Sequence, residues 1–271
     1  MKIPFTKAHG ARNDFLLTWR AEAPPADHAA LARAICDRHS GIGADGWMLV
    51  DPPSDADADG AIQLYNSDGS QAEISGNGTR CAAAFLVGQV SGLPRRDVIR
   101  IRTGAGVKSI RLLDRRGLAF TFEMNMGRAE IQSERFPLPL SAGPRDVTLV
   151  WVGNPQCTVP VENFDFDWRA MGAEIERHPH FPKRTNVSFI RAVDAHTIEA
   201  RFYERGAGET MSSGTGSTGA AVAAVARGIA QSPVRVVTPA GPIDLRLEED
   251  AWLTGPAEIV AEGRFFLEPQ M

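Results

Sequence analysis

Long apolar runs are missing from this chain of 271 residues, although 43% of its residues are hydrophobic. No run approaches the roughly 20 consecutive apolar residues that a membrane-spanning helix needs. The opening Met-Lys-Ile-Pro-Phe also lacks the basic and then apolar layout of a secretory signal peptide. We therefore expect a globular cytoplasmic protein without a membrane partner.

An excess of positive charge is also missing, because 29 Lys and Arg residues stand against 33 Asp and Glu residues. This balance excludes a general electrostatic attraction to nucleic acid and favours a small-molecule partner. Cysteine is scarce as well. The three residues Cys36, Cys81 and Cys157 are odd in number and have no Cys-x-x-Cys spacing, so we expect reduced thiols, with no disulfide framework and no metal site.

An internal repeat is the most informative feature that the sequence does contain. At an offset of 138 residues, the distance from Tyr65 to Tyr203, identical residues align without a gap. The further matches pair Ser75 with Ser213, Gly76 with Gly214, Gly78 with Gly216, Ala82 with Ala220, Ala83 with Ala221, and Asp27 with Asp165. The chain therefore contains two copies of one structural unit.

Each copy reads as a mixture of helices and strands. Asp27 and Asp165 are good N-cap residues, and each opens a helical pattern that Gly41 or Pro179 ends. Short runs of strand-forming residues surround these helices: 15–19, 47–50, 99–102, 118–123, 147–152, 187–190 and 263–267. We predict an α+β fold that occurs twice.

The boundary between the copies is placed at the turn Asp114-Arg-Arg-Gly117. The last strand-like run is expected to return to the first copy. The predicted domains are therefore residues 1–117 with 260–271, and residues 118–259.

A repeated Ser-Gly-x-Gly sequence precedes an alanine-rich helix in each copy, beginning at Ser75 and at Ser213. Glycine allows close approach of the backbone, and the free N–H groups and dipole at a helix start attract anions. Neither copy has a Walker A lysine or the spacing of a dinucleotide-binding fingerprint. Two such helix starts are suited to binding one carboxylate.

Polar clusters also occupy the expected loops. Each by itself fits ordinary turn chemistry, but together they supply donors and acceptors for an amino acid. Glu204 and Arg205 precede the second Ser-Gly-x-Gly directly, so a partner for an ammonium group and a partner for a second carboxylate lie close together.

Polar motifs follow one another along nearly the whole chain: His9-Gly-Ala-Arg-Asn13-Asp-Phe, Gly41-Ile-Gly-Ala-Asp45, Tyr65-Asn66-Ser-Asp-Gly-Ser, Gly76-Asn-Gly-Thr-Arg-Cys-Ala, Gly153-Asn154-Pro, Arg184-Thr-Asn186 and Tyr203-Glu-Arg-Gly-Ala-Gly-Glu-Thr210. In this order they resemble the motifs of the diaminopimelate epimerase family. The resemblance implies two pseudo-symmetric domains, each a curved sheet around a central alanine-rich helix, with the active site in the cleft between them. It further implies a homodimer that uses no pyridoxal phosphate and no metal.

The family also implies roles for individual residues in binding a diamino diacid. Gly76, Asn77, Gly214 and Thr215 would hold the carboxylate at the reacting carbon. The other substrate-binding residues would be Asn13, Asn66, Asn154, Asn186, Glu204 and Arg205. The implied reaction converts LL- to meso-diaminopimelate and supplies lysine and peptidoglycan synthesis.

The sequence departs from the family at both proton-transfer positions. Family members carry a cysteine before each Gly-x-Gly, whereas this chain has Ser75 and Ser213. A thiol has a pKa of about 8.5, whereas a hydroxyl that behaves like water has a far higher pKa. The difference of about 7 pH units makes the alkoxide roughly 10 kcal/mol harder to populate, and a helix dipole worth about 1 kcal/mol does not offset it.

A third departure is Gln156, where the family motif continues Gly-Asn-Pro with histidine. Three readings therefore compete. The chain is an epimerase of the diaminopimelate type with doubtful turnover, an isomerase of the same fold whose base is Glu204 or Glu73, or an amino-acid-binding protein without turnover. The two serines are either natural residues or engineered replacements of cysteine. An engineered origin would not explain Gln156, which would need a separate cause.

Overall fold

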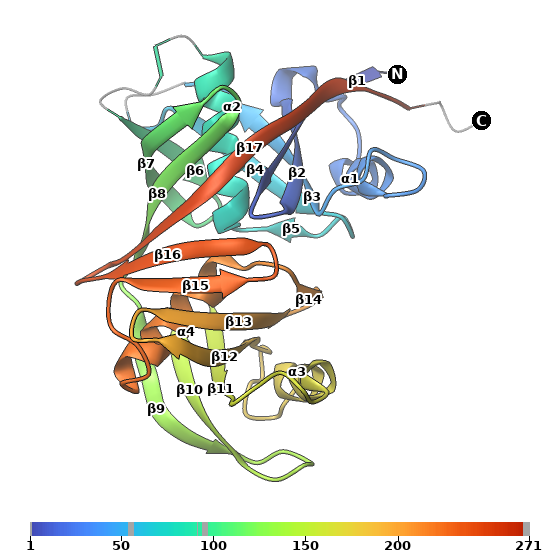
Figure 1. The fold of residues 1–271 in the computed structure, drawn as a ribbon. Coiled ribbons are helices and arrows are strands. Elements are labelled where there is room, and N and C mark those ends of the chain that lie inside the picture. The colour runs from blue at the N-terminus through green and yellow to red at the C-terminus, as the bar shows by residue number, and fades with distance from the viewer. Residues whose placement is uncertain (1, 54–56, 91, 94–96, 268–271) are drawn as a thin grey trace. The chain divides into compact units, whose positions relative to one another are not determined.

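The computed structural model describes residues 2–53, 57–90, 92–93 and 97–267, and Figure 1 shows the chain as a ribbon. Two compact units are present: residues 1–124 with 256–271 form unit 1, and residues 125–255 form unit 2. The division falls inside strands β8 (Ala119–Gly127) and β17 (Ala251–Phe266). The turn at Gly117, where the sequence analysis placed the boundary, joins β7 (Gly106–Arg116) to β8 as an antiparallel hairpin within unit 1.

Unit 1 is a sheet that closes on itself. Its strands pair in the cyclic order β1, β2, β3, β4, β6, β7, β8, β17, and β17 pairs again with β1. The last strand-like run of the sequence thus returns to the first copy, with Phe265 opposite Ile3. The remaining bounds are β1 (Lys2–Gly10), β2 (Asn13–Trp19), a 3-10 turn (Arg20–Glu22), α1 (His28–Cys36), β3 (Gly46–Asp51), β4 (Gly60–Asn66), β5 (Gln71–Ala72), α2 (Gly76–Gln89) and β6 (Val98–Thr103).

Unit 2 repeats the same order of strand pairs. Its ladder runs β9, β10, β11, β12, β13, β15, β16, β17, with parallel pairs between β11 and β12 and between β13 and β15. The bounds are β9 (Glu130–Leu138), β10 (Arg145–Trp151), β11 (Pro155–Pro160), α3 (Trp168–Glu176), β12 (Asn186–Asp194), β13 (Thr197–Glu204), β14 (Gly208–Thr210), α4 (Gly214–Ala226), β15 (Val234–Thr238) and β16 (Gly241–Leu247). The α+β fold predicted for both copies is confirmed.

One alanine-rich helix lies against the strands inside each unit, α2 in unit 1 and α4 in unit 2 (Figure 1). Both helices are buried on nearly every side, which suits helices that a curved sheet surrounds. Small side chains such as Ala82, Ala83, Ala220 and Ala221 let the strands approach closely. No helix in the described part of the chain is long and apolar enough to cross a membrane.

The outer helices α1 and α3 cover the strands with one apolar face each. Asp27 caps α1 as expected, since its carboxylate accepts hydrogen bonds from the N–H groups of Ala29 and Ala30. The expectation for Asp165 is wrong, because Asp167 caps α3 and accepts from Ala170. The helix starts two residues later because Trp168 is buried in the core of unit 2.

Candidate active site

The two serines of the repeat have the same structural role. Ser75 and Ser213 are the N-cap residues of α2 and α4, and their hydroxyl oxygens accept hydrogen bonds from the N–H groups of Gly78 and Gly216, each over 3.1 Å. Their backbones also agree, with φ −131° and ψ 123° at Ser75, and φ −138° and ψ 126° at Ser213. Equivalent residues therefore begin equivalent helices.

The first backbone N–H groups of both helices have no partner within the helix. They belong to Gly76 and Asn77 in α2 and to Gly214 and Thr215 in α4. The first three of these residues are buried, and the positive end of the helix dipole lies at the same place. Each helix start is thus suited to an anion such as a carboxylate.

The second glycine of each motif is closely packed against its surroundings. A Cβ atom at Gly216 would lie 2.8 Å from Ser213 Oγ and 2.9 Å from the ring of Phe202. At Gly78 it would lie 3.2 Å from Ser75 Cβ and 2.4 Å from the end of the Met48 side chain. The helix start and its capping serine pack too closely for a larger residue.

The two serines differ in what accepts their own protons. The Ser213 hydroxyl donates to Glu204 Oε2 over 2.9 Å, and Thr210 donates to Glu204 Oε1 over 2.6 Å. Glu204 is the last residue of β13 and pairs with Gly208 of β14. The tight turn between these strands therefore brings Thr210 back beside the carboxylate of Glu204. In the described part of the chain, the Ser75 hydroxyl donates to no carboxylate.

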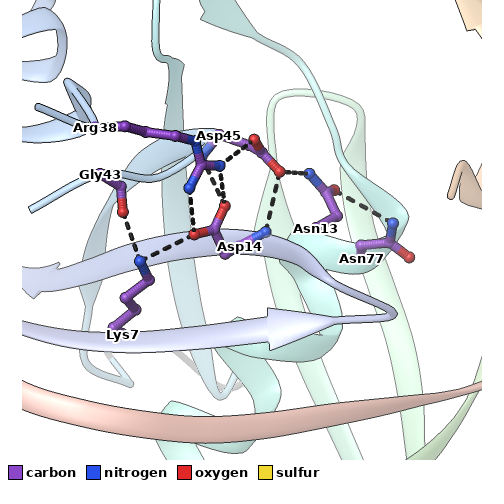
Figure 2. A network of polar contacts seen from close by, with 7 residues as sticks. All are labelled: Lys7, Asn13, Asp14, Arg38, Gly43, Asp45 and Asn77. Atoms are coloured by element: carbon purple, nitrogen blue, oxygen red, sulfur yellow. Dashed lines mark hydrogen bonds and ion pairs between the residues drawn. The ribbon is translucent and has the colours of Figure 1, made fainter. Parts of the chain in front are cut away.

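Asn13 and Asn77 are joined at the start of α2 (Figure 2). Asn77 Nδ2 donates to Asn13 Oδ1 over 3.3 Å, and Asn13 Nδ2 donates to Asp45 Oδ2 over 2.6 Å. At the other end, Arg80 Nη2 donates to Asn77 Oδ1 over 2.6 Å. Arg80 is fully buried, and that burial lowers the pKa of its guanidinium to about 10.

A cluster of alternating charges is joined to Asn13 through Asp45, as Figure 2 shows. Arg38 bridges Asp14 and Asp45, with nitrogen-to-oxygen distances of 2.7 and 2.8 Å, and Lys7 contacts Asp14 over 3.0 Å. Burial alone would raise the pKa of Asp14, but hydrogen bonds from Arg38 and Lys7 lower it below its ordinary value. The cluster therefore favours the ionised form of Asp14.

Unit 2 has a related contact at the start of α4. Asn154 Nδ2 donates to Thr215 Oγ1 over 3.4 Å, and Gln156 Nε2 donates to Asn154 Oδ1 over 2.6 Å. Gln156 is 2% exposed, and its Oε1 has no hydrogen-bond partner in the described part of the chain. In both units, an asparagine at the turn of a β-hairpin thus contacts the second residue of the central helix.

Asn186 and Arg205 are joined in a second cluster of unit 2. Asn186 Oδ1 accepts from the backbone N–H of Arg205 over 3.0 Å, and Asn186 Nδ2 donates to the carbonyl of Pro155. In the same cluster, the buried carboxylate of Glu176 accepts hydrogen bonds from Arg184 over 3.1 Å and from the backbone N–H of Gly206. These bonds fix the turn that carries Arg205, whose side chain is exposed.

The structure separates two of the sequence candidates from these clusters. Asn66 donates to Ser70 Oγ over 2.9 Å within its own turn. Glu73 is exposed, and within the described residues it makes no hydrogen bond with Ser75. Of the two carboxylates considered as a base, only Glu204 contacts a Ser-Gly-x-Gly serine.

The native cysteines do not replace the missing thiols. All three are free and buried, and burial raises the pKa of Cys36 and of Cys81 to about 12. Burial also raises the pKa of Cys157. A thiolate is therefore scarce at each of these positions near neutral pH.

Sequence reasoning assigned no role to three residues that organise the site: Asp45, Arg80 and Glu176. Asp45 and Arg80 lie inside motifs that were recognised, but their contacts depend on the fold. Within the described residues, no group of three or more His, Cys, Asp or Glu side chains could hold a metal ion.

Comparison with known proteins shows a match along nearly the whole chain. The sequence profile described as Diaminopimelate epimerase matches residues 5–132 and 148–260. The chain is 36% identical over 284 residues to the diaminopimelate epimerase of Halothermothrix orenii, covering 99% of each chain. It is 38% identical over 278 residues to that of Pelotomaculum thermopropionicum, covering 96% of this chain and 98% of the relative.

Solved structures show the same fold at low sequence identity. A hydroxyproline epimerase from Agrobacterium vitis with bound trans-4-hydroxy-L-proline has a TM-score of 0.75 at 15% identity, covering 97% of this chain and 92% of that one. A probable proline racemase from Agrobacterium radiobacter has a TM-score of 0.76 at 16% identity, covering 98% of this chain and 94% of that one.

Proposed function

The chain belongs to the diaminopimelate epimerase family, and from this premise we propose that it binds diaminopimelate and epimerises it slowly. The substrate would be a diamino diacid whose reacting carboxylate accepts hydrogen bonds at a capped helix start. We extend the proposal to a cytoplasmic homodimer that works without pyridoxal phosphate or a metal and supplies lysine and peptidoglycan synthesis. These finer points follow from family membership.

The observation that carries the proposal is the pair of capped helix starts. Ser75 and Ser213 have the same backbone conformation and make the same cap hydrogen bond. Each precedes two backbone N–H groups that donate to no carbonyl of their helix. Epimerisation removes a proton from one face of a carbon and returns a proton to the other. The reaction needs two proton-transfer groups, and we assign one such position to each serine because both stand where the family carries its cysteines.

Substrate binding is assigned to the polar residues that surround the two helices. Asn13 and Asn77 belong to the α2 site, and Asn154 and Thr215 belong to the α4 site. Asn66, Asn186, Glu204 and Arg205 complete the set by their match to the family. Glu204 supplies a negative charge for an ammonium group, and the guanidinium of Arg205 supplies two parallel N–H donors for the distal carboxylate.

The rate is expected to be low because oxygen replaces sulfur at both proton-transfer positions. Forming a free alkoxide costs roughly 10 kcal/mol more than forming a thiolate. At Ser213 this cost is reduced, since Glu204 is within 2.9 Å and can take the hydroxyl proton while Ser213 takes the proton of the substrate. Ser75 has no such partner among the described residues.

The Ser213–Glu204 contact also favours a second candidate function. An isomerase of the same fold could use Glu204 as its base on another amino-acid-like acid. Calorimetry with LL-diaminopimelate separates the two candidates. Binding heat together with a raised unfolding temperature supports the first, whereas the absence of both points to another substrate.

Turnover is tested by the exchange of the α-hydrogen in deuterated water, followed by NMR or mass spectrometry. We expect the protein to bind diaminopimelate but to exchange its α-hydrogen far more slowly than the double variant Ser75→Cys, Ser213→Cys. Binding without any exchange above the solvent background would leave only the binding-protein reading.

A further inference from the structure

The side-chain amides at the α2 site form a chain with a single direction of donation. Arg80 donates to Asn77, Asn77 donates to Asn13, and Asn13 donates to Asp45, over 2.6, 3.3 and 2.6 Å. Figure 2 shows the part of this chain from Asn77 to Asp45. An isolated amide can turn over and exchange its donor for its acceptor. Here the groups at the two ends prevent that exchange.

The donor end is a guanidinium, which has no acceptor atom. Arg80 is fully buried, and the described residues include no carboxylate that forms an ion pair with it. Its other bonds go to the carbonyls of Pro256, over 3.1 Å, and Gly76, over 3.4 Å. Only the oxygen of the Asn77 amide can therefore face Arg80, because the amide nitrogen would oppose a donor.

The acceptor end is a carboxylate, which has no donor when it is ionised. Asp45 is held at both oxygens: Oδ1 accepts from Arg38 over 2.8 Å, and Oδ2 accepts from the backbone N–H of Asp14 over 3.1 Å as well as from Asn13. Only the nitrogen of the Asn13 amide can therefore face Asp45. Both amides are oriented from outside the site.

Each oriented amide still has one N–H that the described residues leave unused. The Asn77 side chain is only 2% exposed, and a buried N–H normally has a hydrogen-bond partner. It lies in the same helix turn as the unused backbone N–H groups of Gly76 and Asn77. The α2 site therefore presents several hydrogen-bond donors and suits a ligand group that accepts hydrogen bonds.

The α4 site is not fixed in this way. Its chain ends at Gln156, which is itself an amide with one donor and one acceptor, and the Gln156 Oε1 has no partner among the described residues. Asn154 donates to Thr215 Oγ1, and a hydroxyl can both donate and accept. Neither end of this chain imposes a direction.

We propose that Asp45 and Arg80 are positioning residues that determine ligand specificity at the α2 site. By orienting Asn13 and Asn77 they make the site select a carboxylate over a carboxamide, since a carboxamide brings an NH₂ group that finds donors instead of acceptors. The inference rests on the proposed function, because it takes the diamino diacid as the ligand.

The test compares the binding of LL-diaminopimelate with that of its diamide, measured by calorimetry or by competition. Amidating both ends makes the comparison independent of which end occupies the α2 site. In Asp45→Asn the end group can donate, so Asn13 can turn over. We expect the acid-to-amide affinity ratio to fall about tenfold, the loss of one hydrogen bond to a charged group.

Asp14→Asn is the matched control, because it removes the same charge from the same cluster without touching either amide. It leaves Arg38 and the backbone N–H of residue 14 in place as donors to Asp45. The acid-to-amide affinity ratio should therefore stay within about twofold of the wild type, a smaller change than the loss of one hydrogen bond would cause. An unchanged ratio in Asp45→Asn, or an equal fall in both variants, overturns the inference. If the wild type does not bind the diacid at all, the proposed function fails instead.

A second measurement covers the case in which Asp45→Asn does not fold. Asparagine labelled with ¹⁵N gives side-chain N–H signals of the wild-type protein, and loss of signals in Asn13→Ala and Asn77→Ala assigns them. The diacid should shift one N–H of each residue, and the diamide should leave both in place. Equal shifts with the two ligands would contradict the proposed selectivity.

Discussion

The asymmetry between the serines predicts that two single substitutions have unequal effects. Ser213 already has an acceptor for its proton, Glu204 at 2.9 Å, whereas Ser75 has none among the described residues. Epimerisation needs proton transfer on both faces, so the slower position limits the rate. Replacing Ser75 with cysteine removes the limiting step, and replacing Ser213 alone leaves it in place.

The expected size follows from the chemistry of the two groups. A positioned general base contributes about 10²- to 10⁴-fold to the rate, and the difference in acidity between thiol and hydroxyl sets an upper limit of about 10⁷-fold. We expect Ser75→Cys to raise epimerisation toward the upper part of the first range. Ser213→Cys should raise it less than tenfold, well below the usual contribution of a general base. The double variant should be the fastest.

The assay is the conversion of LL- to meso-diaminopimelate, together with α-hydrogen exchange in deuterated water. The double variant Ser75→Ala, Ser213→Ala is the control for background, and thermal unfolding measures any loss of the helix caps, which costs about 1 kcal/mol each. An equal gain from the two single cysteine substitutions would refute the asymmetry. Equal exchange by the wild type and the double cysteine variant would refute the argument from acidity.

Three further predictions concern the acidic and thiol groups. Glu204→Gln should lower the residual α-hydrogen exchange of the wild type at least tenfold, as expected when a general base is lost; unchanged exchange would exclude Glu204 as the proton acceptor. Because the pKa of Asp14 is lowered in the folded state, its stabilising contribution is complete above the unfolded value of about 3.9 and is lost as the pH falls through the folded value. The unfolding temperature should therefore drop less between pH 4 and 2 in Asp14→Asn than in the wild type. Iodoacetamide at pH 8 should leave native Cys36 and Cys81 unmodified by mass spectrometry, since burial raises their pKa to about 12; rapid labelling of the folded protein would contradict this.

Much of the local structure could be predicted because its causes lie close together in the sequence. Ser75 and Ser213 cap helices through hydrogen bonds that span three residues, and the alanine-rich stretches that follow them form the buried helices. Asp27 caps α1 for the same reason. At Asp165 the same reasoning was wrong, because burial of Trp168 decided where α3 begins.

The partners of the site residues could not be predicted, because sheet register brings them together over long separations. Arg80 contacts Pro256, which is 176 residues away, and Asn77 contacts Asn13, which is 64 residues away. Motif recognition selected Asn13, Asn77 and Glu204 as candidates. It did not show that Asp45 and Arg80 set the direction of the amides.

The repeated unit, the two capped helices and the kinds of polar group at their starts were predictable from the amino acids alone, since periodicity, capping and family motifs are local properties. The fold, in contrast, gives Ser213 a carboxylate partner, whereas Ser75 has none among the described residues. The reason is physical: β13 and β14 turn back at Glu204 and bring it to the cap of α4. A difference between two copies of one motif therefore arises from the strands around them.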